Sequence, residues 1–174
     1  PRKLSLWVSE SSSPKHNLQD LMDAGKFLEA FQFARAQNLD ESPIYKAQCR
    51  SLLLQFSSAD CCLQSLWDEL VHVMDMIEED NYIVRTCIET TCCKAECVSK
   101  LLGYAAKRCN QSVASRGILE TTREQCCAAT ARWKTFQLVN EQVYTADLWN
   151  SFRSSQPLEI LATFFKAARM QEAR

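Results

Sequence analysis

The stretch that decides the fold is Asn17–Tyr45, which reads NLQDLMDAGKFLEAFQFARAQNLDESPIY. Its apolar residues recur every three or four positions, a spacing that places them on one face of an α-helix. Two such groups lie on either side of Gly25: Leu18, Leu21 and Met22 before it, and Phe27, Ala30, Phe31 and Ala34 after it. Two short helices joined by a glycine turn form a helical hairpin. The sequence therefore predicts an all-α protein.

Residues with known positional preferences indicate where these helices begin and end. Asn17 is a residue type that caps helix N-termini. Asn38 tolerates the left-handed backbone conformation that closes many helix C-termini. Ser42-Pro43 places a capping residue just before a proline at the first helical position. We therefore expect helices that begin near Asn17, Phe27 and Ser42.

The helical spacing continues along the rest of the chain, interrupted by short polar joints. We expect a helix over about 59–77 with a stripe of Leu63, Leu66, Trp67, Leu70, Met74 and Ile77. Another should run from about 118 to about 139 with a stripe of Leu119, Thr122, Cys126, Ala129, Trp133 and Phe136. Four more should follow: one capped by Asp80 or Asn81, one that starts at Thr90 or Thr91, one that opens at Thr145 or Asp147, and one that opens at Pro157. About nine helices of mixed length with short joints are typical of an irregular α-solenoid.

The first residues predict a different element. Lys3–Val8 alternates in the manner of a β-strand, and a single strand cannot satisfy its own backbone hydrogen bonds. We expect residues 1–9 to be the last strand of a preceding β domain, 10–16 to be a linker, and 17–174 to be the N-terminal part of a solenoid. Because Phe164–Ala173 repeats the pattern of Leu21–Ala30, we expect the solenoid to be truncated at its C-terminal end and the chain to be a segment of a larger protein.

Charge and hydropathy exclude two classes of partner. The chain has 20 Lys and Arg against 21 Asp and Glu, and no basic stripe stands out, so we expect no nucleic acid partner. The longest nearly apolar stretches, such as Ser51–Phe56, are far shorter than the ~20 residues that cross a bilayer. We therefore expect no direct membrane insertion.

The ten cysteines are best explained as small buried apolar residues in a reducing compartment. One alternative remains open, because Cys92, Cys93 and Cys97 are close enough in sequence to build a zinc or redox module. No phosphate-binding loop or catalytic motif is present, and the Glu78-Glu79-Asp80 carboxylates fall at a helix joint. We therefore expect a non-enzymatic protein with no catalytic, cofactor-binding or metal-binding residues.

Several segments carry a resemblance to a known family. Within Asn17–Tyr45 the particular features are Asn38-Leu39-Asp40 and the Ile44-Tyr45 that leads into Lys46, and further matches are Ile77–Glu89 and Leu101–Arg108. These segments resemble the start of the α-solenoid in the Rod (rough deal) family of the Rod–Zwilch–Zw-ten kinetochore complex. The strand and linker before Asn17 resemble the last strand of that family's β-propeller and its linker. The related NBAS family opens in the same way.

This resemblance implies a non-catalytic scaffold segment of a mitotic kinetochore complex that recruits Spindly and dynein and sustains the spindle assembly checkpoint. The implied partners are Zwilch and Zw-ten type subunits, Spindly and the dynein adaptor machinery. The implied location is the cytoplasm in interphase and the kinetochore and spindle in mitosis. The alternatives are a Golgi-to-ER vesicle-tethering subunit of the NBAS type, the cysteine-based zinc or redox module, and an autonomous tetratricopeptide-like peptide binder.

Overall fold

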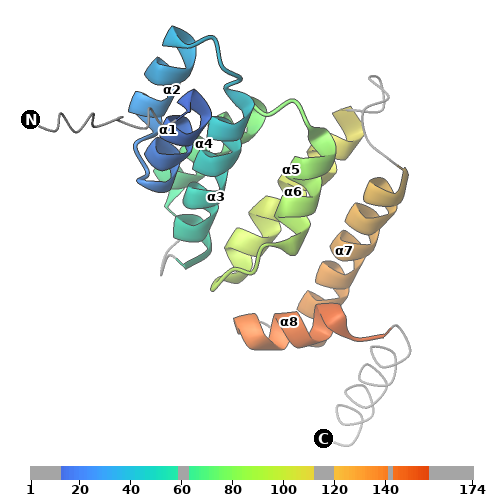
Figure 1. Ribbon diagram of the computed structural model, residues 1–174. Coiled ribbons are helices and arrows are strands. Elements are labelled where there is room, and N and C mark those ends of the chain that lie inside the picture. Colours follow the sequence, from blue (N-terminus) through green and yellow to red (C-terminus); the bar gives the residue numbers. More distant parts are fainter. Residues whose placement is uncertain (1–12, 59–62, 112–119, 141–142, 157–174) are drawn as a thin grey trace, which may run out of the picture. The chain divides into compact units, whose positions relative to one another are not determined.

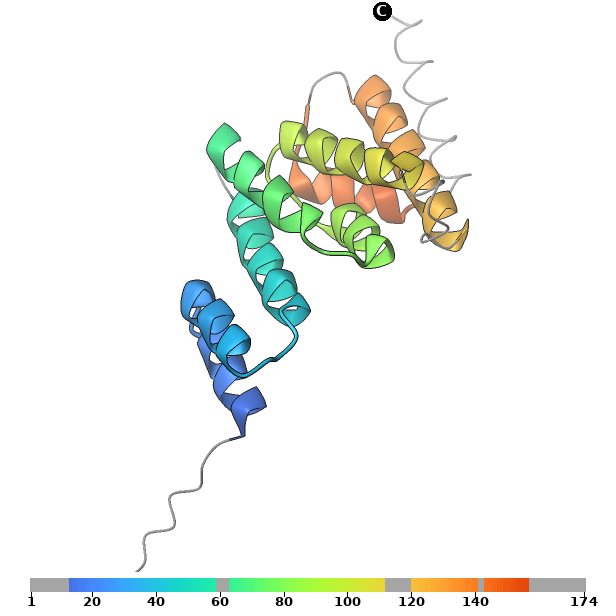
Figure 2. The ribbon, with the colours of Figure 1, turned by 90° about the horizontal axis from the view of Figure 1, so that it is seen from above.

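A computed structural model describes residues 13–58, 63–111, 120–140 and 143–156. Every regular element in these residues is an α-helix, so the predicted all-α fold is confirmed (Figures 1 and 2). The predicted strand over Lys3–Val8 and the predicted helix from Pro157 lie outside the described residues. The helices are α1 (Pro14–Asp23), α2 (Phe27–Ala36), α3 (Ser42–Ser58), α4 (Gln64–Asp75), α5 (Asp80–Glu89), α6 (Ala95–Gln111), α7 (Glu120–Val139) and α8 (Ala146–Ser154).

The chain divides within α3 into two compact units. The first comprises residues 1–51 and the second residues 52–174. In the first unit, α1 and α2 pack as the predicted hairpin. Its core consists of Leu18, Ala30, Ala34 and Ile44. The two alanines are fully buried, and the larger Phe27 and Phe31 of the same predicted stripe are only partly buried around them.

Two left-handed residues end the helices of this hairpin. Gly25 has φ +70°, and the next N–H, of Lys26, donates to the carbonyl of Leu21 at 2.9 Å. Asn38 has φ 51°, and the N–H of Leu39 donates to the carbonyl of Ala34 at 2.8 Å. Both ends are therefore Schellman motifs. The predicted left-handed C-cap at Asn38 is confirmed.

The start of α1 differs from the prediction. The N-cap is Ser13, whose Oγ accepts a hydrogen bond from the N–H of His16 at 3.3 Å, and Pro14 occupies the first helical position. The prediction that Asn17 caps this helix was wrong, because Ser13-Pro14 supplies the same cap-and-proline pair further upstream. Residues 14–16 of the predicted linker are helical, and the division of the chain into strand, linker and solenoid otherwise stays a prediction.

In the second unit, α5, α6 and α7 contact one another pairwise, and α8 packs on α7. Their buried faces carry the predicted periodicity. The residues of the predicted 118–139 stripe are buried at Thr122, Cys126, Trp133 and Phe136. The core also includes Leu70, Val73, Met74, Ile77, Ile83, Val84, Cys87, Cys97, Val98, Leu101, Leu102, Ala105 and Cys109.

Three predicted helix starts in this unit require correction. Leu63 precedes α4 and is 51% exposed, so it does not extend the buried stripe. Glu79, and neither Asp80 nor Asn81, is the N-cap of α5. The start of α6 is Ala95, not Thr90 or Thr91, because tertiary hydrogen bonds hold the preceding loop: the Cys93 N–H donates to the Ser57 carbonyl, and the Tyr144 hydroxyl donates to the Cys92 carbonyl.

The predicted start of α8 is confirmed. Thr145 is its N-cap, and its hydroxyl accepts a hydrogen bond from the N–H of Leu148 at 3.2 Å. Trp149 and Phe152 of α8 are buried against α7, where the Trp149 ring lies edge-on to that of Trp133 with centroids 4.9 Å apart. This aromatic contact fixes the position of α8 on α7.

Candidate functional site

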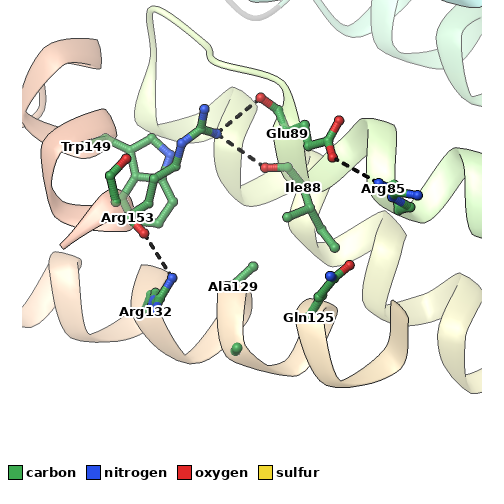
Figure 3. A pocket seen from close by; sticks show the side chains of 10 residues that line it. Arg85, Ile88, Glu89, Gln125, Ala129, Arg132, Trp149 and Arg153 are labelled. Atoms are coloured by element: carbon green, nitrogen blue, oxygen red, sulfur yellow. Dashed lines mark hydrogen bonds and ion pairs between the residues drawn. The ribbon is translucent and has the colours of Figure 1, made fainter. Parts of the chain in front are cut away.

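A groove of about 540 Å³ lies between α5, α7 and α8, in the second unit (Figure 3). Its size is within the range of pockets that bind ligands. Helix α5 contributes Arg85, Ile88 and Glu89, helix α7 contributes Gln125, Ala128, Ala129 and Arg132, and helix α8 contributes Trp149, Arg153 and Ser154.

Helix geometry explains why these side chains converge. On α5 the lining residues are spaced by three and four positions, and on α7 they recur at 125, 128, 129 and 132. Such spacings place side chains on one face of a helix. Each of these two helices therefore turns one face toward the groove. The small residues Ala128 and Ala129 of α7 leave space in the middle of the groove.

Arg153 connects the α8 wall to the α5 wall. Its Nη1 donates to the carbonyls of Ile88 at 3.3 Å and Glu89 at 3.2 Å (Figure 3). Its Nη2 donates to Thr91 Oγ1 at 3.2 Å. The carbonyls at a helix C-terminus have no partner within the helix and carry partial negative charge. Arg153 therefore caps the end of α5 and joins it to α8.

Arg132 and Arg85 occupy the other two walls. Arg132 Nη1 donates to the carbonyl of Arg153 at 2.9 Å, near the end of α8. Arg85 Nη2 lies 4.0 Å from Glu89 Oε1, and both side chains are mostly exposed. The groove thus contains three arginines and one glutamate, so it carries a local excess of positive charge in a chain whose net charge is −1.

The charge of the groove suits it to binding an anion. Guanidinium groups stay protonated and act only as hydrogen-bond donors. The hydroxyl of Ser154 donates to the carbonyl of Asn150 at 2.8 Å, so this hydroxyl is hydrogen-bonded within α8. The groove can therefore attract and orient an anionic group.

The three cysteines of the alternative module occupy different environments. Cys92 and Cys97 are buried, whereas Cys93 is exposed. Within the described ranges, no three His, Cys, Asp or Glu side chains are grouped so that they could hold a metal ion. The predicted absence of metal and cofactor stays a prediction.

Two other cysteines meet between α6 and α7. Cys109 and Cys126 are both buried, and each thiol influences the pKa of the other. Burial raises the pKa of both thiols, that of Cys126 to about 12. These thiols are therefore neutral at physiological pH and serve as packing groups, as the sequence predicted for the cysteines.

The comparison with known families is decisive for the fold family. The family model described as the KNTC1 first ARM-repeats domain matches residues 20–174. The chain belongs to this family. ARM repeats stack helices into a solenoid, so the predicted α-solenoid is confirmed.

Two curated relatives match part of the chain. Proteins named Kinetochore-associated protein 1, from Homo sapiens and from Mus musculus, are each 30% identical over 101 residues, which cover 55% of this chain. The chain spans about 5% of the length of these relatives. The resemblance to the Rod family is thereby confirmed for this domain.

The groove itself was not foreseen from the sequence. Its arginines come from three helices and are 21 to 68 positions apart, so no local motif connects them. The sequence predicted only the spacing within each helix, which assigned Ala129 to a buried stripe. No helix in the described part of the chain is both long and apolar enough to cross a bilayer.

Proposed function

We propose that this chain is a non-catalytic scaffold segment of a kinetochore protein. The observation that carries the proposal is the family match over residues 20–174, together with two relatives named for association with the kinetochore. An ARM-repeat solenoid supports such a role physically, because stacked helices bury a continuous core and leave extended surfaces for protein partners.

The finer proposal is that the chain belongs to a Rod-type subunit that works with Zwilch, Zw-ten, Spindly and dynein adaptors in the spindle assembly checkpoint. It would reside in the cytoplasm in interphase and at the kinetochore and spindle in mitosis. Hydrogen bonds between helices support this proposal, because those of Arg153 and Arg108 hold the helices of the segment in fixed positions. On this proposal the segment acts by placing partners, without chemistry of its own.

The test is a deletion of residues 20–174 from the full-length protein, in cells that depend on the altered copy. A matched control replaces the segment with an unrelated ARM-repeat segment of equal length, which preserves spacing and removes the specific surface. We expect both variants to lose kinetochore signal and to leave mitosis early under a spindle poison. Rescue by the unrelated segment would show that the segment is only a spacer.

A vesicle-tethering subunit of the NBAS type is the alternative function for the same kind of helical scaffold. Normal arrest under a spindle poison, combined with a defect in Golgi-to-ER retrieval, would contradict the kinetochore proposal and support the tether. Because both readouts come from the same cells, the experiment separates the two functions directly.

A further inference from the structure

We infer that the groove between α5, α7 and α8 is a docking site for an acidic segment of a protein partner. The inference rests on the proposed function in one respect, that the chain acts by binding proteins. It identifies the surface that binds the partner and the charge of the partner segment.

The first argument is charge. Arg85, Arg132 and Arg153 face the same groove with Glu89 as its one acidic lining residue. A guanidinium presents a planar fork of N–H donors that matches the two oxygens of a carboxylate. Asp and Glu side chains are therefore the complementary groups, and a partner segment should carry at least two of them to reach opposite walls.

The second argument is the supply of hydrogen-bond donors. In the described part of the chain, Arg85 contacts Glu89 at 4.0 Å, which is longer than a hydrogen bond, and its side chain is 61% exposed. Arg132 uses Nη1 on the Arg153 carbonyl and has further N–H groups on the same guanidinium. Both arginines can thus bind a carboxylate without giving up the bonds they already make.

The third argument is that the groove is already formed. The three hydrogen bonds of Arg153 hold α8 against the end of α5, so the walls do not depend on a ligand. A binding site that is organised in advance loses less entropy when it binds. Ala128 and Ala129 leave room between the walls for a peptide backbone and small side chains.

The lining of the groove disfavours single-stranded nucleic acid as its ligand. Single-stranded nucleic acid is bound largely by stacking bases on exposed aromatic rings. The aromatic residue of the groove, Trp149, is only 3% exposed and offers no such face.

The test uses the whole chain and a fluorescent peptide in which Glu and Asp alternate with Ala and Gly, measured by anisotropy at physiological ionic strength. A matched peptide carries Gln and Asn at the same positions. We expect the acidic peptide to bind at least about ten-fold more tightly than the amide peptide. Arg85→Gln should weaken binding of the acidic peptide by about five-fold or more, and Arg132→Gln should do the same.

Lys134→Gln is the matched control, because Lys134 is an exposed cation on α7 that does not line the groove. It should change binding by less than about two-fold. Arg85 is mostly exposed, so its variant should keep the thermal unfolding of the parent chain. A loss of binding in Arg85→Gln is then a loss of contact with the peptide.

Three results would overturn the inference: equal binding of the acidic and amide peptides, equal losses in Arg85→Gln and Lys134→Gln, or a single-stranded oligonucleotide that displaces the peptide and binds more tightly through Arg85. The last result would assign the groove to nucleic acid. These outcomes are independent of the kinetochore proposal, which the cell experiment tests without the peptide. Either claim can therefore fail while the other stands.

Discussion

Arg108 in α6 donates a hydrogen bond of 2.6 Å from Nε to Oδ1 of Asp80, the residue at which α5 begins. The same guanidinium donates to the carbonyl of Ile77 at 2.7 Å and to Asp75 at 3.2 Å. The Tyr104 hydroxyl also donates to Asp75, at 2.6 Å. One side chain of α6 thus holds the joint between α4 and α5, and this long-range pairing occupies the carboxylate that the sequence assigned to a helix cap.

Replacing Arg108 should destabilise the chain. The Arg108 and Asp80 side chains are only 16% and 19% exposed, so Arg108→Met would leave a largely buried carboxylate without its partner. We expect a loss of about 3 kcal/mol in the free energy of unfolding, measured by urea denaturation. Lys107→Met, at the exposed neighbouring position, should stay within about 0.5 kcal/mol. Similar losses in both variants would show that the pairing with Asp80 contributes little.

Position 38 should distinguish sharply between glycine and alanine. Asn38 has φ 51°, a conformation that glycine adopts freely, that Asn tolerates and that is unfavourable for alanine. We expect Asn38→Ala to lower the free energy of unfolding by about 1 kcal/mol and Asn38→Gly to leave it nearly unchanged. Thermal unfolding of the two variants in parallel measures the difference. If both variants melt together, the Schellman motif after α2 does not control stability.

Trp133 should be the most costly residue to truncate in α7. It packs against Phe136 with ring centroids 5.5 Å apart and against Trp149, and its Nε1 donates to Ser99 Oγ at 3.0 Å. We expect Trp133→Ala to cost about 3–5 kcal/mol in chemical denaturation. Leu138→Ala, at a 76% exposed site on the same helix, is the control and should cost less than about 0.5 kcal/mol. A loss below about 1 kcal/mol for Trp133→Ala would contradict the packing of α8 on α7.

Alkaline pH should weaken the fold through its buried thiols. Burial raises the pKa of Cys49 to about 11 and that of Cys126 to about 12, against an ordinary value of about 8.5. The folded state therefore binds these protons more tightly than the unfolded state. Their contribution to stability is complete below pH about 8.5 and is lost as the pH rises toward about 11 or 12.

Each such thiol should lower the free energy of unfolding by about 1.4 kcal/mol per pH unit across that window. Urea denaturation between pH 7 and pH about 10.5 measures the slope. Cys126→Ala removes one titrating group, so its slope should be shallower whatever its stability at neutral pH. An unchanged slope would show that the pKa of Cys126 does not differ between the folded and unfolded states.

The sequence predicted the helices well where the signal came from residues a few positions apart. The stripe that ends in Trp133 and Phe136, the C-cap at Asn38 and the N-cap at Thr145 depend on neighbours a few positions away, and all three are confirmed. Asn17 failed because an equally local signal, Ser13-Pro14, lies just upstream and was assigned to the linker. When two residues near each other could both be the N-cap, the sequence alone does not decide between them, because the choice depends on the path of the preceding backbone.

Features that join distant residues could not be read in the same way. Asp80 is a good helix cap by type, but Arg108 pairs with it from 28 positions away. Thr90 and Thr91 also suit a helix start, and that loop is instead held by bonds to Ser57 and Tyr144. The groove between α5, α7 and α8 depends entirely on such tertiary placement, so no local pattern in the sequence predicted it.

The bonds of Arg153 also have a mechanical consequence. They connect α8 to the carbonyl of Ile88, 65 positions earlier, and so close a large loop of chain. Stretched out, that loop would measure about 220 Å. If the chain were pulled from both sides of this loop, the loop could not extend until the Arg153 contacts and the packing of α8 had broken. Residues 88–153 should therefore resist extension until the Arg153 contacts break, and should then lengthen as the packing among α5, α6 and α7 is lost.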